Sequence, residues 1–179
     1  MIQRVTFLVG GASSGKSDLA ERWVVATGLP RRYIATAEAQ DAEMAAKIAT
    51  HQRKRGDGWT VVQAPLDLAS ALSDSDHAEV ILLDGITLWL SNLMMANADL
   101  ATAATALLRA IDATRGPLVI VSDEVGQGVV PETALGRRYR DALGQLNRDI
   151  AAHSDCVVGV MAGLPFALKG AMPDVSPDV

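Results

Sequence analysis

The chain has 179 residues, a hydrophobic fraction of 49% and a formal net charge of −5 at pH 7. The apolar content excludes an intrinsically disordered protein, and the acidic balance disfavours a general nucleic-acid-binding role. The single cysteine, Cys156, excludes a disulfide within the chain and a thiolate-rich metal site. From the length we expect one domain over residues 1–169, followed by a short tail over residues 170–179.

The expected location of the protein is the cytoplasm. A strand is predicted almost from the first residue, which leaves no room for a signal peptide. The longest apolar stretch, residues 80–95, is interrupted by Asp84, Gly85, Ser91 and Asn92. This stretch is too short and too polar to cross a bilayer, so we expect neither a membrane span nor a nucleic-acid partner.

In chain order, strands and helices are predicted to alternate. Continuous apolar or β-branched runs predict strands over residues 6–9, 32–36, 59–63, 79–84, 117–122 and 156–161. Helix formers and breakers predict helices over residues 17–26, 42–54, 66–72, 88–96, 100–114 and 131–154. In the last helix one apolar stripe is formed by Leu135, Tyr139, Leu143, Leu146 and Ile150. This alternation predicts an α/β fold whose mostly parallel sheet is covered on both faces and binds ligands at the carboxyl ends of its strands.

The most specific motif lies between the first strand and the first helix. Its eight residues are Gly10, Gly11, Ala12, Ser13, Ser14, Gly15, Lys16 and Ser17. A glycine-rich turn between a strand and a helix lets backbone N–H groups converge on a phosphate at the positive end of the helix dipole. Lys16 can reach the β- and γ-phosphates, and the Ser17 hydroxyl can ligate Mg²⁺. The motif predicts a P-loop that binds a nucleoside triphosphate, and it does not define the reaction.

Carboxylates end two of the buried strands. Asp84 follows an apolar run in the manner of a Walker B aspartate, which can hold Mg²⁺ through water or contact a nucleotide hydroxyl. Capping of the following helix is the alternative role for Asp84. Asp123 and Glu124 end the next strand and are expected at the same edge of the sheet, where a solvated turn is the alternative interpretation.

His51 is a candidate nucleophile. A neutral imidazole can attack phosphorus near pH 7, and cationic neighbours would hold phosphates. A basic helix end is also favourable to the helix dipole without any catalytic role. From the residues alone, we prefer an ordinary surface histidine.

Five blocks of the sequence resemble a known family. They are residues 10–17, residues 33–51 with His51 at their end, residues 83–93, residues 122–147 and residues 162–165. In this order they resemble the bifunctional adenosylcobinamide kinase and adenosylcobinamide-phosphate guanylyltransferase of cobalamin biosynthesis. The resemblance extends from about residue 5 to Lys169, and it implies a P-loop NTPase fold with a RecA-like sheet.

The resemblance implies two reactions. A nucleoside triphosphate, ATP or GTP, first phosphorylates a hydroxyl of adenosylcobinamide with Lys16 at the phosphates. GTP then gives GMP to that phosphate through a GMP–histidine intermediate and releases pyrophosphate. His51 stands at the position of that histidine, so the resemblance overrides the surface-histidine interpretation. Mg²⁺ is expected on Ser17 and Asp84.

Further nucleotide contacts are implied by position within the family motifs. They are Thr36, Ala37 and Glu38 after the second strand, Gln52, Arg53, Lys54 and Arg55 after His51, together with Gln63 and Asp84. Gln63 stands where the family often has Glu, and Asp123 where it often has Asn. Because an uncharged Gln63 is a weaker partner for the guanine N1–H and amino group, selectivity for guanine would decrease.

The family assembles as trimers, so we expect a homotrimer with the nucleotide site near a subunit boundary. Two other functions are compatible with a P-loop alone. One is a monofunctional kinase for another small metabolite, which has no need of His51. The other is a non-catalytic GTP-binding regulatory protein.

Overall fold

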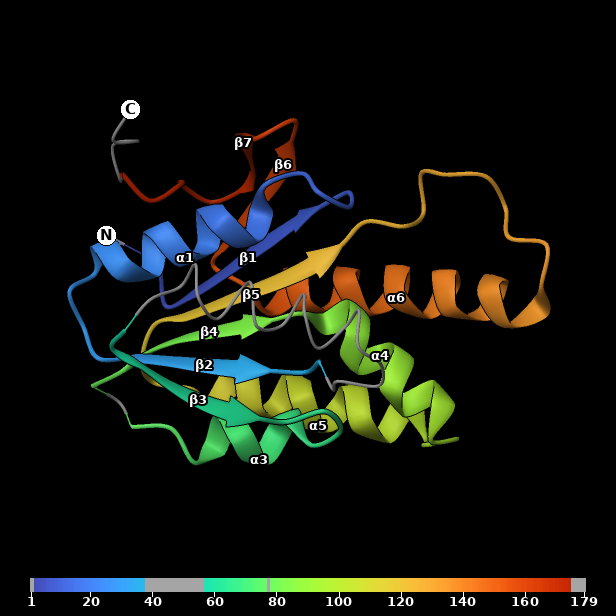
Figure 1. The fold of residues 1–179 in the computed structure, drawn as a ribbon, viewed down its shortest axis with the longest axis horizontal. Helices are drawn as coiled ribbons and strands as arrows, with labels where there is room; N and C mark the ends of the chain where they lie inside the picture. Colours follow the sequence, from blue (N-terminus) through green and yellow to red (C-terminus); the bar gives the residue numbers. More distant parts are fainter. Residues whose placement is uncertain (1, 38–56, 77, 175–179) are drawn as a thin grey trace.

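The fold is built on a single seven-stranded sheet (Figure 1). The computed structural model describes residues 2–37, 57–76 and 78–174. In space the strand order is β3-β2-β4-β5-β1-β6-β7. The strands are β1 (Val5–Gly10), β2 (Arg31–Ala35), β3 (Trp59–Gln63), β4 (Val80–Asp84), β5 (Leu118–Asp123), β6 (Cys156–Met161) and β7 (Leu164–Lys169). Pairing is parallel from β3 to β6, and β7 is antiparallel to β6, which confirms the predicted mostly parallel α/β sheet.

Helices cover both faces of this sheet, as predicted (Figure 1). They are α1 (Lys16–Ala26), α3 (Leu68–Ser73), α4 (Ile86–Met95), α5 (Leu100–Ala113) and α6 (Ala134–His153). One apolar cluster joins α1, through Trp23 and Val24, to one face of the central strands. The other cluster joins α3, α4, α5 and α6 to the opposite face. The central strands are buried from both sides, which is why their sequences are apolar without alternation.

Helix α6 begins three residues later than predicted. The Thr133 side chain accepts a hydrogen bond from the Gly136 N–H, so Thr133 is the N-cap and Ala134 the first helical residue. The predicted apolar stripe is also wrong at its first member, since Leu135 is 56% exposed. Figure 1 shows the reason, because the N-terminal part of α6 extends past the ends of the strands that bury the rest of the helix.

Strand β7 was not predicted. Five of its six residues are exposed and Pro165 is partly buried. The run from Leu164 to Leu168 is apolar, but a proline within so short a run is a signal against a strand. Proline is tolerated because β7 lies at the edge of the sheet. The remaining predicted boundaries in the described ranges lie within two residues of the observed ones. The helix predicted over residues 42–54 lies outside the described residues.

Among the helices of the described ranges, not one combines the length and the apolar character that a membrane-spanning helix requires.

Truncation of Leu143 tests the packing of α6. Its side chain is fully buried between the sheet and the neighbouring helices, so Leu143→Ala should lower the free energy of unfolding by about 3 kcal/mol. Leu135→Ala on the exposed turn of the same helix is the matched control and should change it by less than about 0.5 kcal/mol. Urea denaturation followed by circular dichroism measures both values, and equal losses would contradict this packing.

Candidate nucleotide site

The candidate site lies at the edge where the parallel strands end. In Figure 1 the arrowheads of β1 to β5 point toward the same side of the sheet. Across β1 and β5, Gly10 is in register with Asp123. Asp84 ends β4, the strand next to β5. The P-loop and two carboxylates predicted from sequence therefore meet at one edge, the usual ligand-binding edge of such a sheet.

The P-loop joins the end of β1 to the start of α1. Gly15 is the N-cap residue of α1 with a φ of 90°, a backbone conformation that favours glycine. The Ser14 N–H donates to the Gly11 carbonyl at 3.2 Å, and the Leu19 N–H donates to the Gly15 carbonyl at 3.0 Å. The loop is thus folded back on itself directly before a helix N-terminus, the arrangement that binds phosphates.

Gly10 is required by the close approach of β6. A Cβ atom at this position would lie 2.3 Å from the Val160 carbonyl oxygen and 2.8 Å from Ser14 Oγ. At Gly11, by contrast, an added Cβ would meet nothing within 4 Å. The two neighbouring glycines therefore have different roles, since the first allows the strand to pack and the second leaves the loop open.

Lys16 is buried in the site, with an exposed fraction of 7%. Its Nζ donates to the Gly11 carbonyl at 3.1 Å and lies 2.5 Å from Asp123 Oδ1. The ammonium group is therefore held between the P-loop and the end of β5. Asp123, predicted at this edge, is the residue that the structure brings into direct contact with the P-loop lysine.

Three side chains that we did not assign to the site support Asp123. The Asp123 N–H donates to Thr87 Oγ1 at 2.9 Å, and its carbonyl accepts from Asn147 Nδ2 at 3.0 Å. The Tyr139 hydroxyl donates to the Thr87 carbonyl at 2.9 Å. Burial, and secondarily the charge of Asp123, raises the pKa of Tyr139 to about 12, so the hydroxyl keeps its proton. Thr87, Tyr139 and Asn147 all lie within the family-like blocks at residues 83–93 and 122–147, but no pattern in the sequence connects them with Asp123.

Thr36 is hydrogen-bonded to the backbone of Gly85, the residue after Asp84. It is fully buried, and its hydroxyl donates to the Gly85 carbonyl at 2.8 Å and accepts from the Gly85 N–H at 3.3 Å. Asn92 Nδ2 donates to the Thr36 carbonyl at 2.9 Å and to the Pro65 carbonyl at 3.1 Å. Thr36 thus fastens the end of β2 to the residue after Asp84, and its contact with nucleotide stays a prediction.

The other predicted contacts lie away from the P-loop or outside the described residues. Gln63 is exposed at the end of β3, four strand spacings from β1. At about 4.8 Å per spacing, Gln63 lies roughly 19 Å along the edge from the P-loop. Ala37 is partly buried after β2. The residues outside the described ranges are Glu38, His51, Gln52, Arg53, Lys54 and Arg55.

A cavity of about 600 Å³ lies beside the P-loop. It is lined by residues 10–14 of the P-loop, by Glu124 and Gln127, and by residues of the β6–β7 hairpin that include Phe166. The Gly163 N–H, in the turn between β6 and β7, donates to the Ser14 carbonyl at 2.9 Å. This bond attaches the β6–β7 hairpin directly to the P-loop.

The donors at this edge fit Mg²⁺ that arrives with a nucleotide. Ser17 is half-buried in the first turn of α1, and Asp84 is half-buried at the end of β4. Over residues 2–37, 57–76 and 78–174, no group of three His, Cys, Asp or Glu side chains converges into a metal cage. Mg²⁺ beside phosphates needs only one or two protein ligands, so Ser17 and Asp84 would suffice.

Comparison with known proteins agrees with this geometry. Residues 6–168 match the family model described as cobinamide kinase / cobinamide phosphate guanyltransferase. The chain belongs to this family. It is 43% identical over 166 residues to the Pseudomonas aeruginosa bifunctional adenosylcobalamin biosynthesis protein CobP, covering 91% of this chain and 96% of the relative.

A second relative and one solved structure extend the comparison. The chain is 31% identical over 182 residues to the Escherichia coli bifunctional adenosylcobalamin biosynthesis protein CobU, covering 90% of this chain and 98% of the relative. The RadB recombinase structure is 13% identical with a TM-score of 0.52 and covers 87% of this chain and 73% of its own. That likeness concerns the fold alone, and it bears out the predicted RecA-like sheet.

Alanine at the two neighbouring glycines tests the P-loop packing. Gly10→Ala should lower the free energy of unfolding by about 2 kcal/mol or more, because the Val160 carbonyl is backbone and cannot rotate away. Gly11→Ala should stay within about 0.5 kcal/mol of the parent protein. Both free energies of unfolding are measured by denaturation without nucleotide. A Gly10→Ala protein as stable as the parent protein would disprove the close approach to β6.

Proposed function

We propose that this protein phosphorylates adenosylcobinamide and then transfers GMP from GTP to the resulting phosphate. The observation that carries the proposal is the family match over residues 6–168, within which Lys16 is buried in a P-loop beside Asp123. The names of the relatives describe bifunctional proteins of adenosylcobalamin biosynthesis. A P-loop at the carboxyl edge of the sheet suits the binding of the nucleoside triphosphate that both phosphorus transfers require.

The kinase step forms a bond between the acceptor hydroxyl and the γ-phosphorus and releases a nucleoside diphosphate. Backbone N–H groups of the P-loop and the Lys16 ammonium stabilise the charge that develops on the phosphate oxygens. The proposed donor is ATP or GTP. Mg²⁺, held by Ser17 and Asp84 together with the phosphates, would supply further charge neutralisation.

The guanylyl step proceeds through His51. Its imidazole attacks the α-phosphorus of GTP, forms a phosphoramidate with GMP and releases pyrophosphate. An oxygen of adenosylcobinamide phosphate then attacks the same phosphorus and frees His51. Covalent catalysis divides one transfer into two easier ones. The proposed nucleotide contacts are Thr36, Ala37, Glu38, Gln52, Arg53, Lys54, Arg55, Gln63 and Asp84.

Covalent labelling tests this mechanism. After incubation with Mg²⁺ and GTP labelled at the α-phosphate, the denatured protein should retain label that is lost in acid and stable in base, as expected of a phosphoramidate. His51→Ala should abolish this label. His153→Ala is the matched control, because His153 pairs with Asp112 at 2.7 Å at the end of α6, and it should keep the label.

Two outcomes would redirect the assignment. Absence of label in a protein shown to bind GTP would remove the guanylyl step and leave a P-loop kinase or a GTP-binding regulatory protein. Label that persists in His51→Ala would assign the intermediate to another residue.

Lys16→Ala should lower phosphorylation of adenosylcobinamide at least 100-fold, an effect of about 3 kcal/mol on the transition state.

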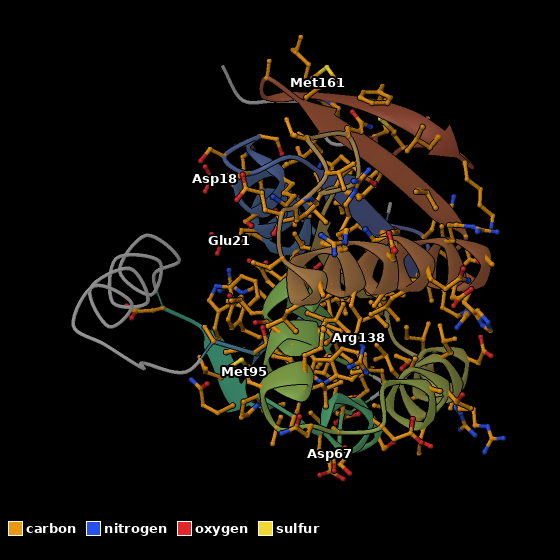
Figure 2. The ribbon with its side chains drawn as sticks, turned by 90° about the vertical axis from the view of Figure 1, so that its right-hand side faces the viewer. Asp18, Glu21, Asp67, Met95, Arg138 and Met161 are labelled. Atoms are coloured by element: carbon orange, nitrogen blue, oxygen red, sulfur yellow. The ribbon has the colours of Figure 1, made fainter. Side chains whose placement is uncertain are left out.

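We also propose that the chain forms a homotrimer in the cytoplasm, with residues 1–169 as one domain and residues 170–179 as a tail. Support for assembly comes from the outer face of β7, where Leu164 is 71% exposed and Leu168 59% exposed on an edge strand. Figure 2 shows Met161 on the same hairpin, pointing outward. Exposed apolar edge strands commonly pair with another chain.

Charge introduced on β7 tests the trimer. Light scattering after gel filtration should give three chain masses for the parent protein and one for Leu164→Glu, because a buried carboxylate opposes association. Met95→Glu is the control, since Met95 is 72% exposed at the end of α4 and its variant should stay trimeric. A monomeric parent protein, or a trimeric Leu164→Glu, would contradict the proposal.

A further inference from the structure

The P-loop lysine has an internal counter-ion. Lys16 Nζ lies 2.5 Å from Asp123 Oδ1, and the Lys16 side chain is 9% exposed. We propose that Asp123 competes with phosphate for Lys16 and thereby sets the affinity of the site for polyphosphates. This inference rests on the proposed function only in taking the P-loop as a polyphosphate site.

A buried ammonium group needs partners that replace water. In the described structure Lys16 has a neutral one, the Gly11 carbonyl, and a charged one, the Asp123 carboxylate. Phosphate oxygens are also anionic acceptors for a lysine. Carboxylate and phosphate can therefore play the same electrostatic role for Lys16. The carboxylate plays it in the protein without ligand, and the phosphate plays it when ligand is bound.

The main chain at Asp123 is held firmly. Its N–H is bonded to Thr87 and its carbonyl to Asn147, while the next residue, Glu124, donates its N–H to the Gly10 carbonyl at 3.0 Å. Because β5 is fixed on both sides of this residue, Asp123 cannot withdraw with its strand when a phosphate arrives. The exchange must come from side-chain rotation, and the carboxylate stays close to the bound phosphate.

Two charge effects oppose the replacement of the Asp123 carboxylate by a phosphate at Lys16. Lys16 must give up a short ion pair, and the incoming phosphate meets a nearby carboxylate of the same sign. Asparagine has nearly the same shape and can still accept a hydrogen bond from Lys16, but it carries no charge. Asp123→Asn should therefore bind polyphosphate more tightly while leaving the empty protein less stable.

Calorimetric titration with sodium tripolyphosphate in the absence of Mg²⁺ tests the competition without any nucleoside. Asp123→Asn should lower the dissociation constant about tenfold, near the lower end of the effects measured for close charge pairs. Asp18→Asn is the matched control, because Asp18 is exposed in the first turn of α1 and Figure 2 shows it directed into solvent. That variant makes the same change in charge near the P-loop and should shift the dissociation constant less than twofold.

Thermal unfolding gives the second readout. Without ligand, Asp123→Asn should unfold at a lower temperature than the parent protein, since Lys16 has lost its counter-ion. At saturating tripolyphosphate the difference should disappear or reverse, because phosphate replaces the carboxylate. A merely structural role for Asp123 would lower both temperatures equally and leave the dissociation constant unchanged.

Each other result overturns the inference. If Asp123→Asn and Asp18→Asn lowered the dissociation constant for tripolyphosphate equally, the effect would be one of net charge in general. Weaker binding by Asp123→Asn would make Asp123 a ligand-supporting residue. No binding of tripolyphosphate to the parent protein would remove the polyphosphate site itself. The cobinamide reactions are measured in separate assays. If those reactions were absent, a tenfold lower dissociation constant of Asp123→Asn for tripolyphosphate would still support this inference.

Discussion

The packing of β1 between β5 and β6 is the constraint on which the rest of the site depends. Gly10 ends β1 so close to the Val160 carbonyl that a Cβ has no space. On the other side, the register of β1 and β5 brings Asp123 level with Gly10. The P-loop must begin at this point, and Lys16, the first residue of α1, then reaches the end of β5. The two neighbours of β1 therefore determine both the start of the phosphate loop and the partner of its lysine.

The parallel sheet also separates two parts of one edge. The P-loop lies near β5 and β1, whereas Gln63 lies at the end of β3, roughly 19 Å away by the usual strand spacing. Between them, Thr36, Gly85 and Asn92 form a partly buried set of hydrogen bonds that joins the end of β2 to α4. These bonds hold the backbone in the middle of the edge in place. If Gln63 contacts the base as proposed, the phosphates and the base of one nucleotide would be held by separate strands of the same sheet.

Local signals were sufficient for strands β1 to β6, the P-loop and the position of Asp84. The apolar runs of β4 and β5 are buried on both faces, and a glycine-rich turn before a helix has few alternatives. The missed features depend on contacts between distant residues. The pairing of Lys16 with Asp123 joins positions 107 residues apart, and the exposure of Leu135 follows from where the strands end. Strand β7 is apolar in sequence but contains Pro165, and a proline is accepted there because β7 pairs only with β6 at the edge of the sheet.

The bond between the Gly163 N–H and the Ser14 carbonyl connects the β6–β7 hairpin to the phosphate loop. The hairpin carries the exposed apolar residues of β7, while the loop carries the backbone groups that would bind a phosphate. A partner that changed the position of the hairpin would thus also change the conformational freedom of the loop. Thermodynamic linkage is reciprocal, so phosphate in the loop would change the affinity for that partner by the same factor. If the subunits associate through β7, assembly and phosphate binding would be coupled through the β6–β7 hairpin, by this bond together with the pairing of β6 with β1.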